Sequence, residues 1–165
     1  MFPNGLRGAG PRPSQARRAG GLAILLIGAY TRIMKVDCYC TVLRSATRRM
    51  AAFYDEAMAP LGINIAQFSL LRSIARLEPV ILTELGRRME LDRSTIGRNV
   101  RVLERMGLVK LGSGKDRREA TVMLTEAGRR VLQEAAPLWE AAQAALEARM
   151  GVKATQELRE ILNRI

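Results

Sequence analysis

The chain has 165 residues, a formal net charge of +11 at pH 7, no His and two Cys. The absence of His excludes Ser-His-Asp and Cys-His nucleophilic sites and imidazole-dependent zinc sites, and two Cys cannot complete a four-ligand metal site. Aromatic residues make up only 4% of the chain, which argues against single-strand binding by base stacking. We therefore expect a basic, mostly helical protein that is not an enzyme, has no metal or cofactor, and meets nucleic acid or an anionic surface.

The first 33 residues are not expected to belong to the fold. They contain five Arg and no acidic residue, and their first twenty positions are rich in Pro, Gly and Arg, a composition that is typical of disorder. The apolar run Gly21–Tyr30 is shorter than the roughly 20 residues needed to span a bilayer. We expect residues 1–33 to be a disordered extension or a stretch that precedes a true start at Met34; a signal peptide or membrane tether is the alternative.

The next segments show helical periodicity. Apolar residues recur at three-and-four spacing over 37–58 and again over 64–77, with Phe68, Leu71 and Ile74 facing inward. Pro60-Leu61-Gly62 should end the first helix and Pro79 the second.

A short strand and two further helices are expected next. Val80-Ile81 is the strand, and Thr83 is a plausible N-cap for a helix from Glu84 to Met89. Asp92 should cap a helix from Arg93 to Met106, and Gly107 suits its C-terminal cap.

A β-hairpin and two helices complete the pattern. Residues 108–111 and 119–124 are strand-like and flank a turn-rich tip at 112–116, and helices are expected over about 125–150 and 154–165. The order predicts a mainly α fold with a small β-hairpin wing. Within a domain spanning 34–165, the winged helix-turn-helix occupies about 63–124. The helices at about 37–59 and 125–165 have more apolar surface than one small domain can bury, which predicts dimerisation through them.

The predicted helix over 93–106 has the pattern that indicates function most directly. Ile96, Val100 and Leu103 fall on one face, whereas Ser94, Arg98, Arg101 and Arg105 fall on the opposite face. Residues 93–118 have a net charge of +6, equal to that of the whole of 34–165. Because one helix fits the major groove, where Arg pairs with guanine or phosphate, we expect DNA contacts here. The predicted DNA-binding residues of this helix are Arg93, Ser94, Thr95, Arg98, Asn99, Arg101 and Arg105.

The hairpin tip should supply a second contact. Lys115, Arg117 and Arg118 lie where a loop would project beside the helix, and guanidinium groups favour a narrow minor groove. Asp116 can orient a neighbouring Arg by hydrogen bonding; a simple turn residue is the alternative.

Two stretches, LDRSTIGRNVRVLERMGLV and KDRREATVMLTEAG, resemble the multiple-antibiotic-resistance regulator (MarR) family of winged-helix transcription factors. The resemblance covers most of the chain from Asp37 onward. It implies an obligate homodimer built from the terminal helices, bound to a pseudo-palindromic operator in double-stranded DNA. It also implies that a wing Arg, here Arg118 or Arg117, enters the minor groove.

Cys38 and Cys40 are the clearest indication of what the protein could sense. They lie at the start of a predicted helix, and helix N-termini favour the reactive thiolate form of cysteine. The stretch CTVLRSATRRMAAFY resembles a helix of the organic-hydroperoxide-sensing branch of that family, which implies Cys40 as the reactive thiol and Tyr54 as its hydrogen-bond partner. A small buried hydrophobic residue is the alternative reading of Cys40.

A small aromatic or carboxylate effector competes with redox sensing. The family resemblance implies a pocket between the dimer helices and the winged domain, and the candidates for its wall are Tyr54, Met58, Phe68, Arg72 and Trp139. We expect a cytoplasmic, dimeric, sequence-specific DNA-binding regulator, a repressor released by ligand or by thiol oxidation. A thiol-disulfide redox protein using Cys38 and Cys40 is the alternative.

Overall fold

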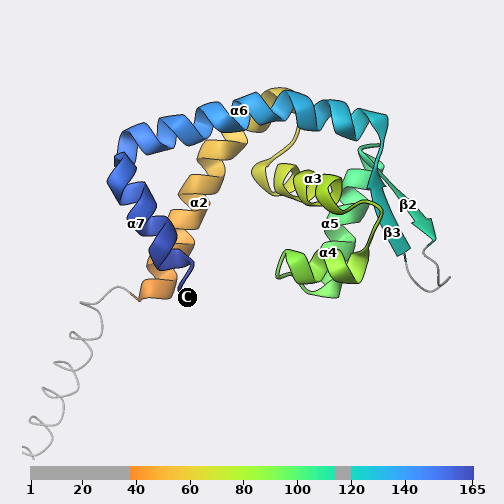
Figure 1. Cartoon of the computed structure of the whole chain (residues 1–165), viewed down its shortest axis with the longest axis horizontal. Coiled ribbons are helices and arrows are strands. Elements are labelled where there is room, and N and C mark those ends of the chain that lie inside the picture. The colour runs from red at the N-terminus through yellow and green to blue at the C-terminus, as the bar shows by residue number, and fades with distance from the viewer. Residues whose placement is uncertain (1–37, 114–119) are drawn as a thin grey trace, which may run out of the picture. The chain divides into compact units, whose positions relative to one another are not determined.

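A computed structural model describes residues 38–113 and 120–165 of the chain. The chain divides into two units at Ala46 and Thr47, and this boundary falls within the first described helix. The architecture is mainly helical with three short strands, as predicted (Figure 1). The described elements in chain order are α2 (Tyr39–Met58), η1 (Ala59–Leu61), α3 (Ile65–Leu77), β1 (Val80–Ile81), α4 (Leu82–Arg88), α5 (Arg93–Arg105), β2 (Val109–Ser113), β3 (Ala120–Leu124), α6 (Glu126–Met150) and α7 (Val152–Leu162).

The predicted break after α2 is confirmed. Pro60 lies in the 3-10 turn, and Gly62 follows it in the left-handed conformation with φ 66°. Asn64 then caps α3: its side chain accepts from the backbone N–H of Gln67, and the Gln67 side chain accepts from the backbone N–H of Asn64. This reciprocal pair satisfies two N–H groups that a helix start otherwise leaves without partners.

The predicted N-cap at Thr83 is wrong. Ile81 pairs with Thr121 in the sheet, and α4 begins directly after it at Leu82. Ile81 therefore occupies the cap position without a side-chain hydrogen bond, and Thr83 lies inside the first turn. The local preference of Thr for a cap is overridden here because strand pairing keeps the backbone extended up to Ile81.

The three strands form one antiparallel sheet in the order β1-β3-β2. Val109 pairs with Leu124 at one end of the hairpin and Ser113 pairs with Ala120 at the other. Gly112 and Ser113, expected in the turn, therefore belong to β2, whereas residues 114–116 of the expected turn lie outside the described residues.

The end of α5 is joined to the start of α6. Gly107 has φ 73°, which a residue without Cβ adopts at low cost, and the N–H groups of Gly107 and Leu108 donate to the carbonyls of Glu104 and Leu103. The helix expected from about residue 125 is present as α6. Thr125 caps it by accepting from the Gly128 N–H, and the Thr125 hydroxyl donates to the Gly107 carbonyl.

The core lies under the helix-turn-helix. Helices α3 to α5 and the sheet gather at the N-terminal end of α6 (Figure 1). Burying each large side chain contributes about 1.5–3 kcal/mol. The largest fully buried side chains are Phe68, Met58, Leu71, Ile74, Leu85, Ile96, Leu103, Val100 and Val122.

The last helix remains largely uncovered. No residue of α7 is buried, and Val152, Ile161 and Leu162 are exposed. Within the described ranges, none of the helices combines the length and apolarity needed to span a membrane.

Candidate nucleic-acid interface

Helix α5 presents two chemically distinct faces, as its periodicity predicts. Ile96, Val100 and Leu103 have no exposed surface and belong to the core. The exposed side chains include six predicted contacts, and Thr95 is half-buried beside them. Those six are Arg93, Ser94, Arg98, Asn99, Arg101 and Arg105. The helix therefore holds its four Arg side chains in water on a rigid support.

Asp92 fixes the start of α5. One carboxylate oxygen accepts from the backbone N–H groups of Ser94 and Thr95, each at 2.9 Å. The hydroxyls of Ser94 and Thr95 donate to the same carboxylate at 2.6 and 2.7 Å. These donors, the two hydroxyls first, hold the pKa of Asp92 below its usual value. Asp92 was predicted only as a cap, but it also sets the orientation of two predicted DNA contacts.

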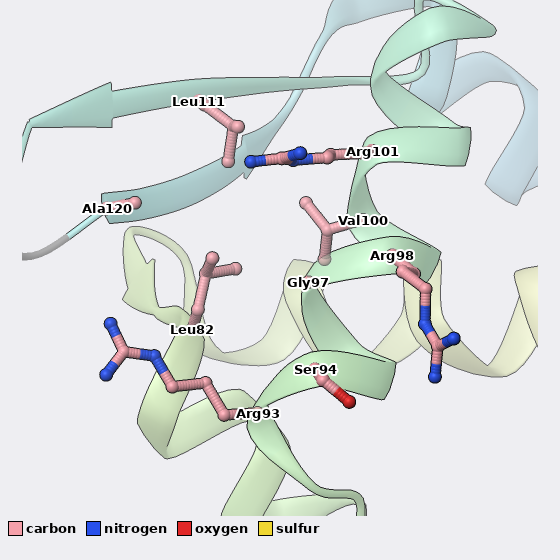
Figure 2. Close-up of a pocket in the computed structure, with 9 residues that line it drawn as sticks. All are labelled: Leu82, Arg93, Ser94, Gly97, Arg98, Val100, Arg101, Leu111 and Ala120. Carbon is pink, nitrogen blue, oxygen red and sulfur yellow. The ribbon is translucent and has the colours of Figure 1, made fainter.

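A groove of about 580 Å³ runs between α5 and the hairpin (Figure 2). Four predicted contacts line it: Arg93, Ser94, Arg98 and Arg101. The remaining wall is apolar and comes from α4, α5 and both strands of the hairpin: Leu82, Gly97, Val100, Leu111 and Ala120. Figure 2 shows Arg93 and Arg101 pointing toward that wall, whereas Arg98 points away from it.

The predicted wing contacts Lys115, Asp116, Arg117 and Arg118 lie outside the described residues. The Ser113–Ala120 pair is the last described register position before them. The other predicted α5 contacts, Thr95, Asn99 and Arg105, do not line the groove.

Both Cys are free and exposed. Backbone N–H groups of Thr41 and Cys40 donate toward the Cys38 sulfur and lower the pKa of that thiol. Tyr54 is buried, and its hydroxyl donates to the side-chain oxygen of Gln143 on α6. Sequence patterns could not reveal this partner, because it lies 89 positions away. Burial is the main cause that raises the pKa of Tyr54.

The structure brings together three of the five predicted effector-pocket residues. Phe68, Arg72 and Trp139 line a pocket of about 260 Å³ between α3 and α6. The Arg72 guanidinium lies 4.5 Å from the Trp139 ring centroid and 5.6 Å from that of Phe68. Met58 is fully buried instead, and Tyr54 lines a separate pocket. In the part of the chain that the structure describes, no three His, Cys, Asp or Glu side chains gather as metal ligands would.

Comparison with known proteins identifies the fold. A family model described as the MarR family matches residues 61–119. The transcriptional regulator MosR of M. tuberculosis, solved in complex with DNA, is 34% identical, with a TM-score of 0.66 over 76% of this chain and 93% of that one. This chain belongs to the MarR family. The predicted winged helix-turn-helix is thereby confirmed.

Other relatives of this MarR-family chain are regulators too. A probable transcriptional regulator from Pseudomonas aeruginosa is 26% identical, with a TM-score of 0.71 over 78% of this chain and 96% of that one. The uncharacterized HTH-type transcriptional regulator YwoH of Bacillus subtilis (strain 168) is 26% identical over 92 residues, which is 56% of this chain and 67% of YwoH. The chain is a DNA-binding transcriptional regulator, and these relatives give no support to the redox-protein alternative.

Proposed function

We propose that this regulator is a cytoplasmic homodimeric repressor without enzymatic activity, which reads a pseudo-palindromic operator through α5 and the wing. The observation that carries the proposal is the groove rimmed by Arg93, Arg98 and Arg101 on a helix whose other face is core. Cationic side chains held on a rigid helix suit the major groove. In this proposal Ser94, Thr95, Asn99 and Arg105 add backbone and base contacts from the same helix.

The wing completes the contact in this proposal. Arg118 or Arg117 enters the minor groove, Lys115 contacts phosphate, and Asp116 orients a neighbouring Arg. The support is the hairpin itself, since the paired strands β2 and β3 lead to this segment from one wall of the groove.

The helices outside the winged domain supply the homodimer contact. The support is apolar surface that a single chain leaves exposed. These exposed side chains are Tyr39, Val42, Leu43, Met150, Val152, Ile161, Leu162 and Ile165. A two-fold interface would bury the same surface twice and place two α5 helices about one DNA turn apart. In this proposal residues 37–59 and 125–165 dimerise, 63–124 bind DNA, and 1–33 take no part.

Release from the operator has two candidate triggers. The α3–α6 pocket, with Arg72 stacked on Trp139, suits an aromatic carboxylate, which can pair with the guanidinium and stack on the ring. The second candidate trigger is oxidation by peroxide of the exposed Cys40 thiol, with Cys38, whose thiol pKa is lowered, as the second reactive thiol.

DNA contact is tested with Arg98→Ala and Arg118→Ala, each measured on a duplex that the wild-type protein selects from genomic fragments. We expect each to cost about 1–3 kcal/mol of binding free energy and binding to weaken steeply with salt. Arg130→Ala, which removes an exposed Arg from α6, is the matched control and should bind as wild type. Losses below about 1 kcal/mol for both contact variants would contradict the contact assignment.

Dimerisation is tested by sedimentation of wild type and of Ile161→Glu, which places a charge on the exposed face of α7. We expect wild type to sediment as a dimer, and the variant to shift toward monomer and to lose affinity for the two-half-site duplex. A monomeric wild type would contradict the proposal.

A further inference from the structure

Gly97 lies in the middle of α5, a position at which a regular helix does not require glycine. Apart from Pro, Gly is the poorest helix former, because it loses the most backbone freedom on folding. Gly97 is not among the glycines with positive φ. A Cβ built at Gly97 meets nothing within 4 Å. Among the described residues, therefore, neither backbone conformation nor packing requires a glycine at this position.

The surroundings of Gly97 indicate what requires it. Arg93 and Arg101 lie four residues before and after it, so the three residues form one ridge of the helix. This ridge borders the groove, and Figure 2 shows Gly97 between the two Arg positions, opposite Leu82. At Gly97 no side chain covers the helix backbone. This bare stretch lies between the Arg93 and Arg101 side chains and faces the apolar wall of the groove.

We infer that Gly97 is a close-approach position at which one deoxyribose-phosphate strand of the operator lies directly against the α5 backbone. The anionic phosphates on either side of this point pair with Arg93 and Arg101, and the apolar wall of Leu82, Leu111 and Ala120 contacts the sugar edge. Charge complementarity selects this occupant, since the groove is rimmed by cations. A Cβ at Gly97 would hold the strand away and lengthen both Arg–phosphate contacts together. This inference rests on the proposed DNA contact by α5.

The test is the series Gly97→Ala and Gly97→Leu, in which the side chain grows while helix propensity rises above that of glycine. Affinity is measured by fluorescence anisotropy on a duplex selected by the wild type, and Tm by circular dichroism. We expect Tm to stay or rise in both variants, while Kd rises at least tenfold for Ala and further for Leu. The slope of log affinity against log salt should also become shallower, because phosphate contacts are lost.

Ser73→Ala on α3 is the matched control, because it also raises helix propensity but lies outside the groove. Its Kd should equal that of wild type. A Kd for Gly97→Ala within twofold of wild type would overturn the inference, and so would a lowered Tm, which would mean that the chain itself needs the glycine. If wild type selects no duplex, or Arg98→Ala binds as wild type does, the proposed DNA contact fails instead.

Discussion

Gly128 on α6 lies directly against the backbone carbonyl of Leu108, just beyond the end of α5, so Gly128→Ala should destabilise the fold. A Cβ at Gly128 would lie 2.0 Å from the carbonyl oxygen of Leu108, where ordinary contact begins at 3.4 Å. About 1.4 Å must therefore be gained by moving backbone. The Leu108 carbonyl cannot move alone, because it accepts from the Thr125 N–H at 3.0 Å and the Leu108 N–H donates to Leu103.

Two opposing effects decide the sign of the Gly128→Ala change. Alanine gains up to about 1 kcal/mol of helix propensity, whereas forced overpacking costs typically about 1–3 kcal/mol. We expect overpacking to win, since no rotamer change relieves a clash with backbone. The expected net loss of about 1–2 kcal/mol lowers Tm by roughly 3–8 °C, as followed by circular dichroism. Arg130→Ala on the exposed side of the same helix is the control, and an unchanged or raised Tm for Gly128→Ala would refute the reasoning.

Three further outcomes follow from the described contacts. Asp92→Ala should lower both Tm and DNA affinity at neutral pH, and Asp92→Asn should retain more of each. The folded-state pKa of Asp92 is depressed, so its contribution to stability is present above its unfolded-state pKa and is lost as pH falls toward the folded value. The Tm values of wild type and Asp92→Ala should therefore converge as the pH is lowered from 7. Arg72→Met should alter the emission of Trp139, the only Trp in the chain, and titration with aromatic carboxylates should perturb that emission less than in wild type; equal responses would remove Arg72 from the effector site. Organic peroxide should release wild type from its duplex but not Cys40→Ser, with Cys38→Ser tested alongside, and equal release from wild type and Cys40→Ser would remove Cys40 as the sensor.

Sequence periodicity predicted the elements whose cause is local. The buried face of α5 follows from apolar residues spaced by three and four, and all three of Ile96, Val100 and Leu103 are fully buried. The predicted cap at Asp92 follows from a side chain that accepts from backbone N–H groups of the next turn. In these cases the interacting residues lie within a few positions of each other in the chain, so the interaction can be predicted from the local sequence.

The features that the sequence did not predict depend on distant partners. Thr83 has the right chemistry for a cap, but Ile81 is committed to pairing with Thr121, 40 positions later. The Tyr54 hydroxyl reaches its partner Gln143 only because the fold brings Tyr54 next to α6. Gly128 looks like an ordinary helix-start residue until the Leu108 carbonyl is seen against it. Each of these needs the tertiary fold, which no local pattern encodes.

The junction at Leu108 and Thr125 connects the proposed DNA-binding helix α5 to the proposed dimerisation helix α6. Gly107 follows the end of α5, and its carbonyl accepts from the Thr125 hydroxyl at 2.6 Å. Thr125 in turn caps α6, which continues as one helix of 25 residues to Met150, a length of about 37 Å at 1.5 Å per residue. One backbone hydrogen bond, from the Thr125 N–H to the Leu108 carbonyl, and the close contact at Gly128 join the segment after α5 to the start of α6. We therefore expect a movement of the end of α5 to displace the start of α6. The position of the exposed Arg side chains of α5 therefore depends on the position of α6. The far end of α6 leads into α7 and its exposed apolar side chains.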